Sequence, residues 1–410
     1  MEIGRERSLD LTYCTSIHPA DGWENVERNI RRHAPALKQA LSPSARFGLG
    51  LRLSAREAKE LLEGDRLERF ADFLDDHGLY VALLNGFPYG PFHGVAVKEK
   101  VYAPDWRDNA RVEYTLDLIE ILRRLLPGGL DGSVSTVPFS FKAWMPPGVL
   151  EAAWMGMISN LMRVAERLVR IEDEDGKSIH LDIEPEPACV IENTAEAIGF
   201  FHNKLVPIGA PVLAKICGIP LDAAREHVLK HIQLCFDCCH FAVEHEEPVK
   251  ALKRIQSSGV GIGRIQLSSA LRAIFPADPA GAQTTAGKLG PFTETVYLHQ
   301  VGEKCAQGAR VFPDLEDALR EGHAGAKEWC IHFHVPLFTA EYDGFAGTQG
   351  ETAAVLKAAC ETDFTTHLEI ETYTWDVLPT GLKIDLQASI QREYEWVLAH
   401  VPGAVAAGGM

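Results

Sequence analysis

Short apolar runs that alternate with amphipathic helical patterns constrain the fold of this chain more than any other feature. Each run has the length of a buried strand, and the alternation recurs about eight times. Strands that alternate with helices favour a parallel sheet, and about eight repeats favour its closure into a (β/α)8 barrel. A doubly wound open sheet is the alternative, but no Gly-rich phosphate loop follows any of the runs.

The chain is longer than such a barrel requires. Its 410 residues exceed the roughly 250 that are typical of the fold, so the surplus is expected in loops. We expect a single elaborated barrel over residues 1–400, a long insertion between the seventh and eighth strands at about 275–328, and a flexible tail at 401–410. Long irregular insertions inside compact domains are usually functional.

The individual elements follow from the apolar period and from end signals. Ser54 and Glu57 have capping-box spacing at the start of one helix. The expected strands are 9–18, 47–53, 79–84, 133–141, 179–187, 233–237, 261–270, 329–338 and 367–375, and the expected helices are 24–41, 55–77, 109–126, 155–171, 194–205, 353–360 and 386–400.

Charge and cysteine content exclude several classes of function. The formal net charge of −17 repels phosphate backbones and anionic lipids, so we expect no nucleic-acid partner. The nine cysteines are scattered without a paired C-x-x-C framework and are expected to be reduced thiols. The N-terminus lacks the apolar region of a signal peptide, and no apolar run could span a bilayer. We therefore expect a cytoplasmic protein without membrane insertion.

The stretch 233–240 joins a buried strand to candidate metal ligands. Its apolar half ends in Asp237, and His240 follows three residues later. A carboxylate and an imidazole at the mouth of a buried strand suit a metal site in an α/β barrel. An isolated Asp-x-x-His pair is weak evidence, and the repetition of carboxylates and imidazoles at other strand ends strengthens it.

A second polar strand end lies at His180, Asp182 and Glu184. These residues alternate with apolar neighbours, which places all three on one side of a strand. Pro185 and Pro187 forbid further ladder pairing, so Glu184 is expected at the end of the strand. A solvated edge strand with outward acidic residues is the alternative.

Further candidate side chains follow other runs. His332 and His334 share one face of the expected strand 329–338, and Glu371 lies on the same face as Glu369 in the last strand. His18, after the first strand, and Asn85, which opens an aromatic loop, are candidate substrate contacts. A solvated histidine and a rigid surface turn are the alternatives for this last pair.

Four short motifs, taken in order, resemble the EboE-type metabolite traffic proteins of the ebo cluster, within the xylose isomerase-like TIM-barrel superfamily of sugar isomerases, epimerases and endonuclease-IV-type enzymes. The motifs are Tyr13-Cys14-Thr15-Ser16-Ile17-His18-Pro19, Glu184-Pro185-Glu186-Pro187, His332-Phe333-His334-Val335-Pro336 and Glu371-Thr372-Tyr373-Thr374-Trp375. The similarity covers nearly the whole chain and implies a TIM barrel.

The resemblance implies one divalent ion (Mn, Mg, Co or Zn) held by Glu184, Asp237 and Glu371. The superfamily places a histidine on the seventh strand, where this sequence has Gln266. Either Gln266 takes that position or His334 supplies the imidazole, and we favour His334. His240 and His332 are expected to contact substrate.

The implied activity is that of a metal-dependent isomerase or epimerase on a sugar, cyclitol or similar polyol, linked to the processing or export of secondary-metabolite precursors. Glu184 and Glu371 would exchange protons beside the ion. A non-catalytic metabolite-binding protein and an endonuclease-IV-like phosphodiesterase remain alternatives, and the charge argues against the latter. A homodimer is compatible with the sequence.

Overall fold

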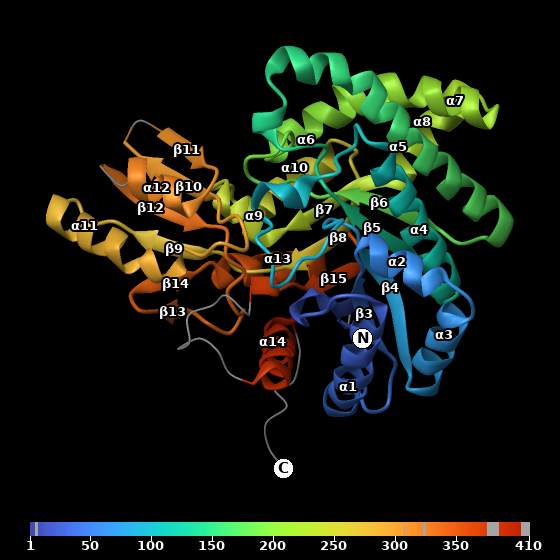
Figure 1. The fold of residues 1–410 in the computed structure, drawn as a ribbon, viewed down its shortest axis with the longest axis horizontal. Helices are drawn as coiled ribbons and strands as arrows, with labels where there is room; N and C mark the ends of the chain where they lie inside the picture. Colours follow the sequence, from blue (N-terminus) through green and yellow to red (C-terminus); the bar gives the residue numbers. More distant parts are fainter. Residues whose placement is uncertain (5–6, 307, 323–324, 375–384, 403–410) are drawn as a thin grey trace.

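A closed barrel of parallel strands lies at the centre of the molecule (Figure 1). The structure is a computed structural model that describes residues 1–4, 7–306, 308–322, 325–374 and 385–402. Within these residues the barrel strands are β2 (Leu9–Tyr13), β3 (Phe47–Arg52), β4 (Leu79–Asn85), β5 (Gly132–Thr136), β6 (Ile179–Ile183), β7 (Ile232–Asp237), β8 (Ile262–Leu267) and β15 (His367–Ile370).

The sheet runs β2-β15-β8-β7-β6-β5-β4-β3, and β1 (Glu2–Ile3) pairs antiparallel with β2. A parallel bridge between Cys14 and Gly50 joins the two ends of this order and closes the barrel. The expected α/β barrel, with its insertion between the seventh and eighth barrel strands, is therefore confirmed.

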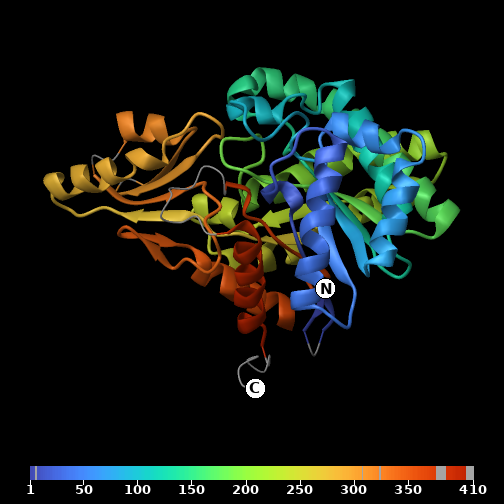
Figure 2. The same ribbon diagram turned by 60° about the horizontal axis from the view of Figure 1, so that its bottom comes forward.

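Helices surround the barrel (Figures 1 and 2). They are α1 (Trp23–Leu41), α2 (Ala55–Leu62), α3 (Arg66–Asp76), α4 (Asn109–Leu125), α5 (Pro147–Asp175), α6 (Thr194–Phe200), α7 (Ala210–Cys217), α8 (Leu221–His231), α9 (Cys238–Val243), α10 (Pro248–Ser257), α13 (Gln349–Glu361) and α14 (Leu386–His400). A π-helical segment, Phe201–Gly209, joins α6 to α7. Ser54 caps α2 in a complete capping box with Glu57, as the sequence predicts.

The insertion forms a second, antiparallel sheet to one side of the barrel, on the left in Figures 1 and 2. Its elements are β9 (Leu271–Ile274), α11 (Pro279–Lys288), β10 (Val301–Cys305), β11 (Gly308–Phe312), α12 (Leu315–Glu321), β12 (Ala326–Ile331), β13 (Glu341–Tyr342) and β14 (Phe345–Gly347). The strands pair in the order β11-β10-β12-β9-β14-β13. The expected range, about 275–328, covers the middle of this lobe, whose strands begin at Leu271 and end at Gly347.

Several expected elements differ in extent from the observed ones. The strands expected over 9–18, 133–141 and 367–375 end at Tyr13, Thr136 and Ile370, and two further differences have a clear physical cause. The helix expected over 55–77 is two helices, because Gly64 adopts a left-handed conformation (φ +63°) between α2 and α3. The strand expected over 329–338 ends at Ile331, so His332 and His334 follow it rather than belong to it. Trp375, expected in the last strand, and the expected tail from 403 onward lie outside the described residues.

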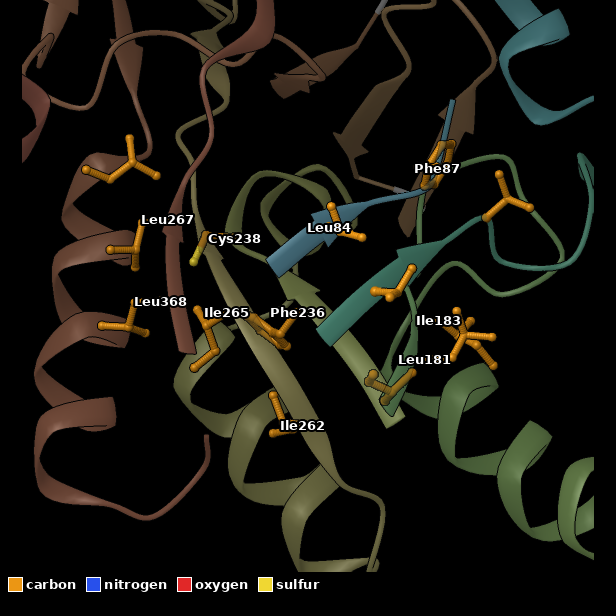
Figure 3. Packing of buried hydrophobic residues seen from close by; sticks show 14 of the residues in the cluster. Leu84, Phe87, Leu181, Ile183, Phe236, Cys238, Ile262, Ile265, Leu267 and Leu368 are labelled. Atoms are coloured by element: carbon orange, nitrogen blue, oxygen red, sulfur yellow. The ribbon is translucent and has the colours of Figure 1, made fainter. Parts of the chain in front are cut away.

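Apolar and polar residues alternate along the barrel strands, and each kind faces one side. Phe236, Ile265, Leu267 and Leu368 are fully buried and belong to the apolar layer between the strands and the surrounding helices (Figure 3). The opposite parity carries polar side chains into the barrel. Since both faces are buried, the strands read as nearly continuous apolar runs with single polar interruptions.

Arg264 is the centre of the polar barrel interior. Its guanidinium lies 3.0 Å from Glu369 Oε2 and 3.7 Å from Asp182 Oδ2, and all three side chains are fully buried. It also donates to the Ser133 hydroxyl (2.7 Å) and to the Asn85 side-chain oxygen (3.1 Å). The cation thus links side chains from five barrel strands, counting its own, and forms ion pairs with two buried carboxylates.

A second polar cluster closes the opposite, N-terminal end of the barrel. His180 Nδ1 lies 2.6 Å from Asp182 Oδ1, and its Nε2 lies 3.5 Å from Asp131 Oδ2. His367 Nε2 lies 3.1 Å from the same Asp131 carboxylate. Burial alone would lower the pKa of His180, but Asp182 and Asp131 raise the pKa to about 9. His180 is therefore a buried imidazolium near neutral pH.

No single helix among the described residues is long and apolar enough to cross a membrane. One pair, Thr194–Cys217 with Leu221–His231, meets the length and composition criteria together but is bent by 111°. All nine cysteines are free.

The Arg264→Met variant tests the barrel interior. Removing the cation leaves Glu369 as an uncompensated buried charge and takes one of its charged partners from Asp182, so the free energy of unfolding should fall by about 3–5 kcal/mol. Urea unfolding followed by circular dichroism measures the loss. The control, Arg124→Met, removes an exposed partner of Glu68 and should change stability by less than about 0.5 kcal/mol. Equal effects of the two variants would contradict the role of Arg264.

The His180 cluster makes stability depend on pH. The folded-state pKa of His180 lies above its unfolded value of 6.5, so its stabilisation is complete below about pH 6.5 and is lost as pH rises through about 9. The free energy of unfolding, measured by urea titration at several pH values, should show this loss in the wild type. His180→Gln should remove that part of the pH dependence, and the exposed-site variant His202→Gln should retain it.

Candidate functional site

A small cavity of about 60 Å³ opens at the C-terminal mouth of the barrel. Side chains from the ends of several barrel strands and from the insertion lobe line it, among them Asn85, Glu184, His240, His332, Glu371 and Tyr373. The C-terminal ends of parallel strands meet at one end of a barrel, which brings residues that are distant in sequence together.

Asp237 ends β7 and caps the short helix α9. Its Oδ1 accepts hydrogen bonds from the backbone amides of Cys239 (2.7 Å) and His240 (3.1 Å) and from the Ser268 hydroxyl (2.7 Å). Its Oδ2 is buried and has no hydrogen-bond partner among the described residues. Burial alone would raise the pKa of Asp237, but His240 and His334 lower it below its usual value. The carboxylate is therefore charged, and its Oδ2 accepts from no N–H or hydroxyl group of the described residues, while the Glu371 carboxyl group adjoins the side chain.

Three imidazoles converge near Asp237, and each is held through its Nδ1 atom. Nδ1 of His240 donates to the Pro185 carbonyl (2.8 Å), and Nδ1 of His334 donates to the Glu371 carbonyl (3.0 Å). A carbonyl oxygen only accepts, so each Nδ1 carries a proton. The neutral ring of His334 keeps a lone pair on Nε2. Burial alone would lower the pKa of His240, but Asp237, Glu186 and Glu184 raise it above its usual value. Nδ1 of His332 is held in the same way by an amide oxygen, 2.7 Å away. A hydrogen bond from one ring nitrogen orients a histidine whose other ring nitrogen binds a metal.

Nε2 of His332 and Nε2 of His334 lie 3.2 Å apart. Burial lowers the pKa of both residues, that of His334 to about 4, so neither ring is protonated near neutral pH and two lone pairs face each other. The Tyr373 hydroxyl donates to His332 Nε2 (3.1 Å) and relieves the repulsion only in part. Two nitrogens at roughly 2.0–2.1 Å from one tetrahedral ion stand roughly 3.3 Å apart, so the arrangement suits a shared cation.

The sequence-based spacing of these histidines is wrong. A straight strand would hold residues two apart at roughly 6.5–7 Å along the chain. The chain instead folds tightly after β12, because the amide of Phe333 bonds the Ile331 carbonyl (2.7 Å) and the amide of Val335 bonds the Phe333 carbonyl (3.0 Å). These i to i+2 bonds are those of successive γ-turns, which bring the two imidazoles together.

Three glutamates surround the imidazoles. Burial raises the pKa of Glu184 to about 8, with Asp237 and Glu186 adding to the effect and His240 opposing it. Burial and the neighbouring Glu184 and Asp237 raise the pKa of Glu371 well above its ordinary range. Burial also raises the pKa of Glu186. At neutral pH Glu184 and Glu371 therefore hold protons that they can exchange.

Several residues expected at the site do come together there. Glu184 Oε1 lies 3.9 Å from His240 Nδ1, His334 Nε2 lies 3.9 Å from Asp237 Oδ2, and Glu371 Oε2 lies 3.8 Å from His334 Nδ1. Asn85 also lines the cavity, where its amide donates to a Glu369 oxygen at 2.8 Å.

Two expected residues lie elsewhere. The strand β2 ends at Tyr13 and a 3-10 helix over Thr15–Ile17 turns the chain, so His18 stacks on His33 (4.7 Å between ring centroids) outside the cavity. Gln266 lies within the barrel, where its Oε1 accepts from the Cys235 thiol (3.0 Å). It does not line the cavity, and neither do Asp237 and His334, whose ligand atoms lie close to those of His240.

Four residues of the site were not predicted. Gln300 positions His332 through its amide oxygen and donates to Glu186 (3.0 Å) and to the Tyr102 hydroxyl (2.8 Å). Tyr373 contacts the same histidine. Glu186 carries a sequence signal in the Glu-Pro-Glu-Pro motif, and Tyr373 lies in the last quoted motif. Tyr102 and Gln300 come from connecting segments whose approach to the barrel no local pattern indicates.

These groups include donor sets that could hold a metal ion. Ligand atoms of Asp237, His240 and His334 lie within 4.8 Å of one another, and His332 forms overlapping sets with Glu186 and His240 and with Cys239 and His334. Burial raises the pKa of the Cys239 thiol well above its usual value, which disfavours a thiolate ligand. Fold and site together define an α/β-barrel protein with a buried carboxylate–imidazole centre at its C-terminal mouth.

Comparisons with known proteins give only distant matches. No protein-family model matches the chain, and no curated protein matches it. The structure is similar to that of the probable 3-DHS dehydratase AsbF, involved in petrobactin synthesis, from Bacillus anthracis (12% identity, 94% of this chain and 98% of that chain, TM-score 0.43). It is also similar to the IOLI protein with a binding zinc atom (13% identity, 97% and 100%, TM-score 0.45). At these scores the matches assign no activity, and the chain's own strand order defines the barrel.

The raised pKa of Glu184 predicts a protonated carboxyl group in the metal-free protein up to about pH 8. Infrared spectroscopy of protein dialysed against chelator should show the carbonyl stretch of a buried carboxylic acid at pH 7. Glu184→Gln should remove one component of this band, and Glu68→Gln, an exposed control, should not. A spectrum without any protonated carboxyl at pH 7 would contradict the geometry described for the mouth.

Proposed function

We propose that the protein is a divalent-metal-dependent isomerase or epimerase that acts on a sugar, cyclitol or similar polyol-type metabolite. One observation carries the proposal. His334 Nε2 lies 3.9 Å from the buried Oδ2 of Asp237, and ligand atoms of these two residues and of His240 lie within 4.8 Å of one another, beside the cavity at the C-terminal end of the barrel.

The donor set fits a divalent ion. Asp237, His240 and His334 would hold it, with His332 beside them. Mixed carboxylate and imidazole ligands suit zinc, cobalt and manganese. When bound, such an ion would polarise a substrate carbonyl and its neighbouring hydroxyl, which acidifies the C–H bond between them.

Glu184 and Glu371 are the groups that would move protons. They stand at the ends of β6 and β15, which are separated in the sheet by β7 and β8, and both line the cavity. One would take a proton from carbon as a carboxylate, and the other would deliver a proton as a carboxylic acid. Their raised pKa values bring this exchange close to neutral pH.

The cavity favours a neutral polyol over an anionic substrate. The two cations that line it are already paired, Arg52 with Glu57 (3.3 Å) and Lys98 with Asp314 (2.6 Å). Uncharged hydrogen-bonding groups, including Ser16 and the amide of Asn85, also line the cavity and suit hydroxyl groups.

A finer assignment rests on the four motifs that resemble the EboE-type proteins. It supports a role in processing secondary-metabolite precursors for export, in the cytoplasm. The alternative function is that of a metabolite-binding protein on the same barrel, which would keep the cavity. A binding protein would not exchange protons at a carbon atom of its ligand, whereas the enzyme would.

Metal titration tests the site. Chelator-treated protein should bind about one equivalent of Mn²⁺, Co²⁺ or Zn²⁺ at the mouth. Asp237→Asn and His334→Gln should each weaken the affinity for the ion about 10-fold or more, since losing a residue that merely orients a ligand already has an effect of this size. Gln266→Ala should retain the ion because the Gln266 amide oxygen already accepts from the Cys235 thiol inside the barrel. If Gln266→Ala loses the ion and His334→Gln retains it, the proposed ligand set is wrong.

Proton exchange separates the enzyme from the binding protein. Loaded protein is incubated in D₂O with free ketopentoses, ketohexoses and keto-inositols, and NMR detects deuterium at the carbon beside the carbonyl. Glu184→Gln and Glu371→Gln should retain the ion and lose exchange. If these variants lose the ion instead, both glutamates are ligands, as the superfamily resemblance implies. Wild-type protein that binds the ion and a ketose without exchange would support the binding function.

A further inference from the structure

Helix α8 carries two histidines one turn apart, His227 and His231, whose ligand atoms lie within 4.8 Å of each other and of Glu172 on α5. Residues at positions i and i+4 lie on one face of a helix. We propose that Glu172, His227 and His231 form a second metal site, separate from the barrel mouth, for a transition-metal ion of the zinc type.

His231 is positioned as a ligand. Its side chain is fully buried, and its Nδ1 lies 2.8 Å from the Ile179 carbonyl, so Nδ1 donates and Nε2 carries the lone pair. Nε2 lies 3.2 Å from Glu172 Oε2 without forming a hydrogen bond. Two ligand atoms about 2.0–2.1 Å from one tetrahedral ion stand roughly 3.3 Å apart, which matches this separation.

The second histidine repeats this pattern. Nδ1 of His227 is also buried without a hydrogen-bond partner among the described residues. The imidazole rings of His227 and His231 are nearly parallel, with 5.8 Å between centroids and 10° between planes. Two buried nitrogens without partners, on adjacent turns and beside one carboxylate, are costly unless a cation occupies the space between them.

One oxygen of the Glu172 carboxylate is available as a metal ligand. Lys230 pairs with Oε1 of Glu172, which leaves Oε2 directed at the imidazoles. Glu172 is partly exposed, at 26% of its side chain, so solvent can complete the coordination. Two imidazoles and one monodentate carboxylate, with water in the fourth position, is a zinc-type donor set, whereas Mg²⁺ and Ca²⁺ require mostly oxygen ligands.

The site differs from the imidazole–carboxylate cluster at the base of the barrel. There, His180 lies between Asp131 and Asp182, and a proton on the imidazole already supplies a positive charge between the two carboxylates. His231 faces a single carboxylate that Lys230 already balances, and burial lowers its pKa, so the ring is neutral and can bind metal. An ion here would join α5 to α8 at the start of β6.

Cobalt titration of the whole chain tests the proposal. Chelator-treated wild type, His227→Gln and His231→Gln are titrated with Co²⁺, and the visible absorption of imidazole-bound cobalt is recorded, followed by displacement with Zn²⁺. Each variant should bind one equivalent fewer than the wild type, or bind it about 10-fold or more weakly. His202→Gln, which alters an exposed histidine bonded to the Ser258 carbonyl, is the control and should match the wild type.

The outcome is independent of the barrel mouth. Asp237→Asn should lose the equivalent assigned to the mouth and retain this one, so failure of one site does not imply failure of the other. His227 is only half-buried, so His227→Gln keeps the test valid if His231→Gln does not fold. Equal cobalt stoichiometry and affinity in wild type and His227→Gln would overturn the proposal.

Discussion

The buried ion pairs of Arg264 hold the polar interior of this barrel together. A guanidinium without water must have its charge and its donors satisfied by the protein, and Arg264 meets this need with Asp182, Glu369 and groups of the neighbouring strands. Glu369 in turn accepts from Asn85, which lines the mouth. Gly50 leaves the room that this carboxylate occupies, because a Cβ there would stand 1.7 Å from its oxygen. The ion pairs and hydrogen bonds around Arg264 thereby hold Asn85 in place at the mouth of the barrel.

Much of this arrangement follows from the alternation of apolar and polar residues along the strands. The alternation around Asp182 and the prolines after Glu184 are enough to predict which side chains enter the barrel and where the strand ends. Parallel strands that close into a barrel must bring their C-terminal ends together, so the convergence of Glu184, Asp237 and Glu371 follows from local pattern and topology. The capping box at Ser54 is equally local and is confirmed.

What the sequence did not reveal depends on tertiary contacts and on tight turns. The alternation of residues predicted a strand through His334, but it cannot distinguish an extended chain from successive γ-turns. An extended chain would keep His332 and His334 apart, whereas the γ-turns bring them together. His18 was misplaced for a similar reason, since a 3-10 helix after β2 breaks the parity. The partnership of His332 with Gln300 joins two segments of the insertion lobe, and neither segment signals the other.

The insertion lobe supplies His332 and His334, whereas Asp237 and His240 belong to the barrel. Any ion held between them therefore ties two structural units with separate sheets into one cooperative system. Occupancy would then govern local opening as well as chemistry: the lobe would detach at a lower free-energy cost in the metal-free chain, and hydrogen exchange in β10 and β12 would report the loading of a site to which those strands contribute no ligand. Shortening this lobe would remove two imidazoles from the mouth.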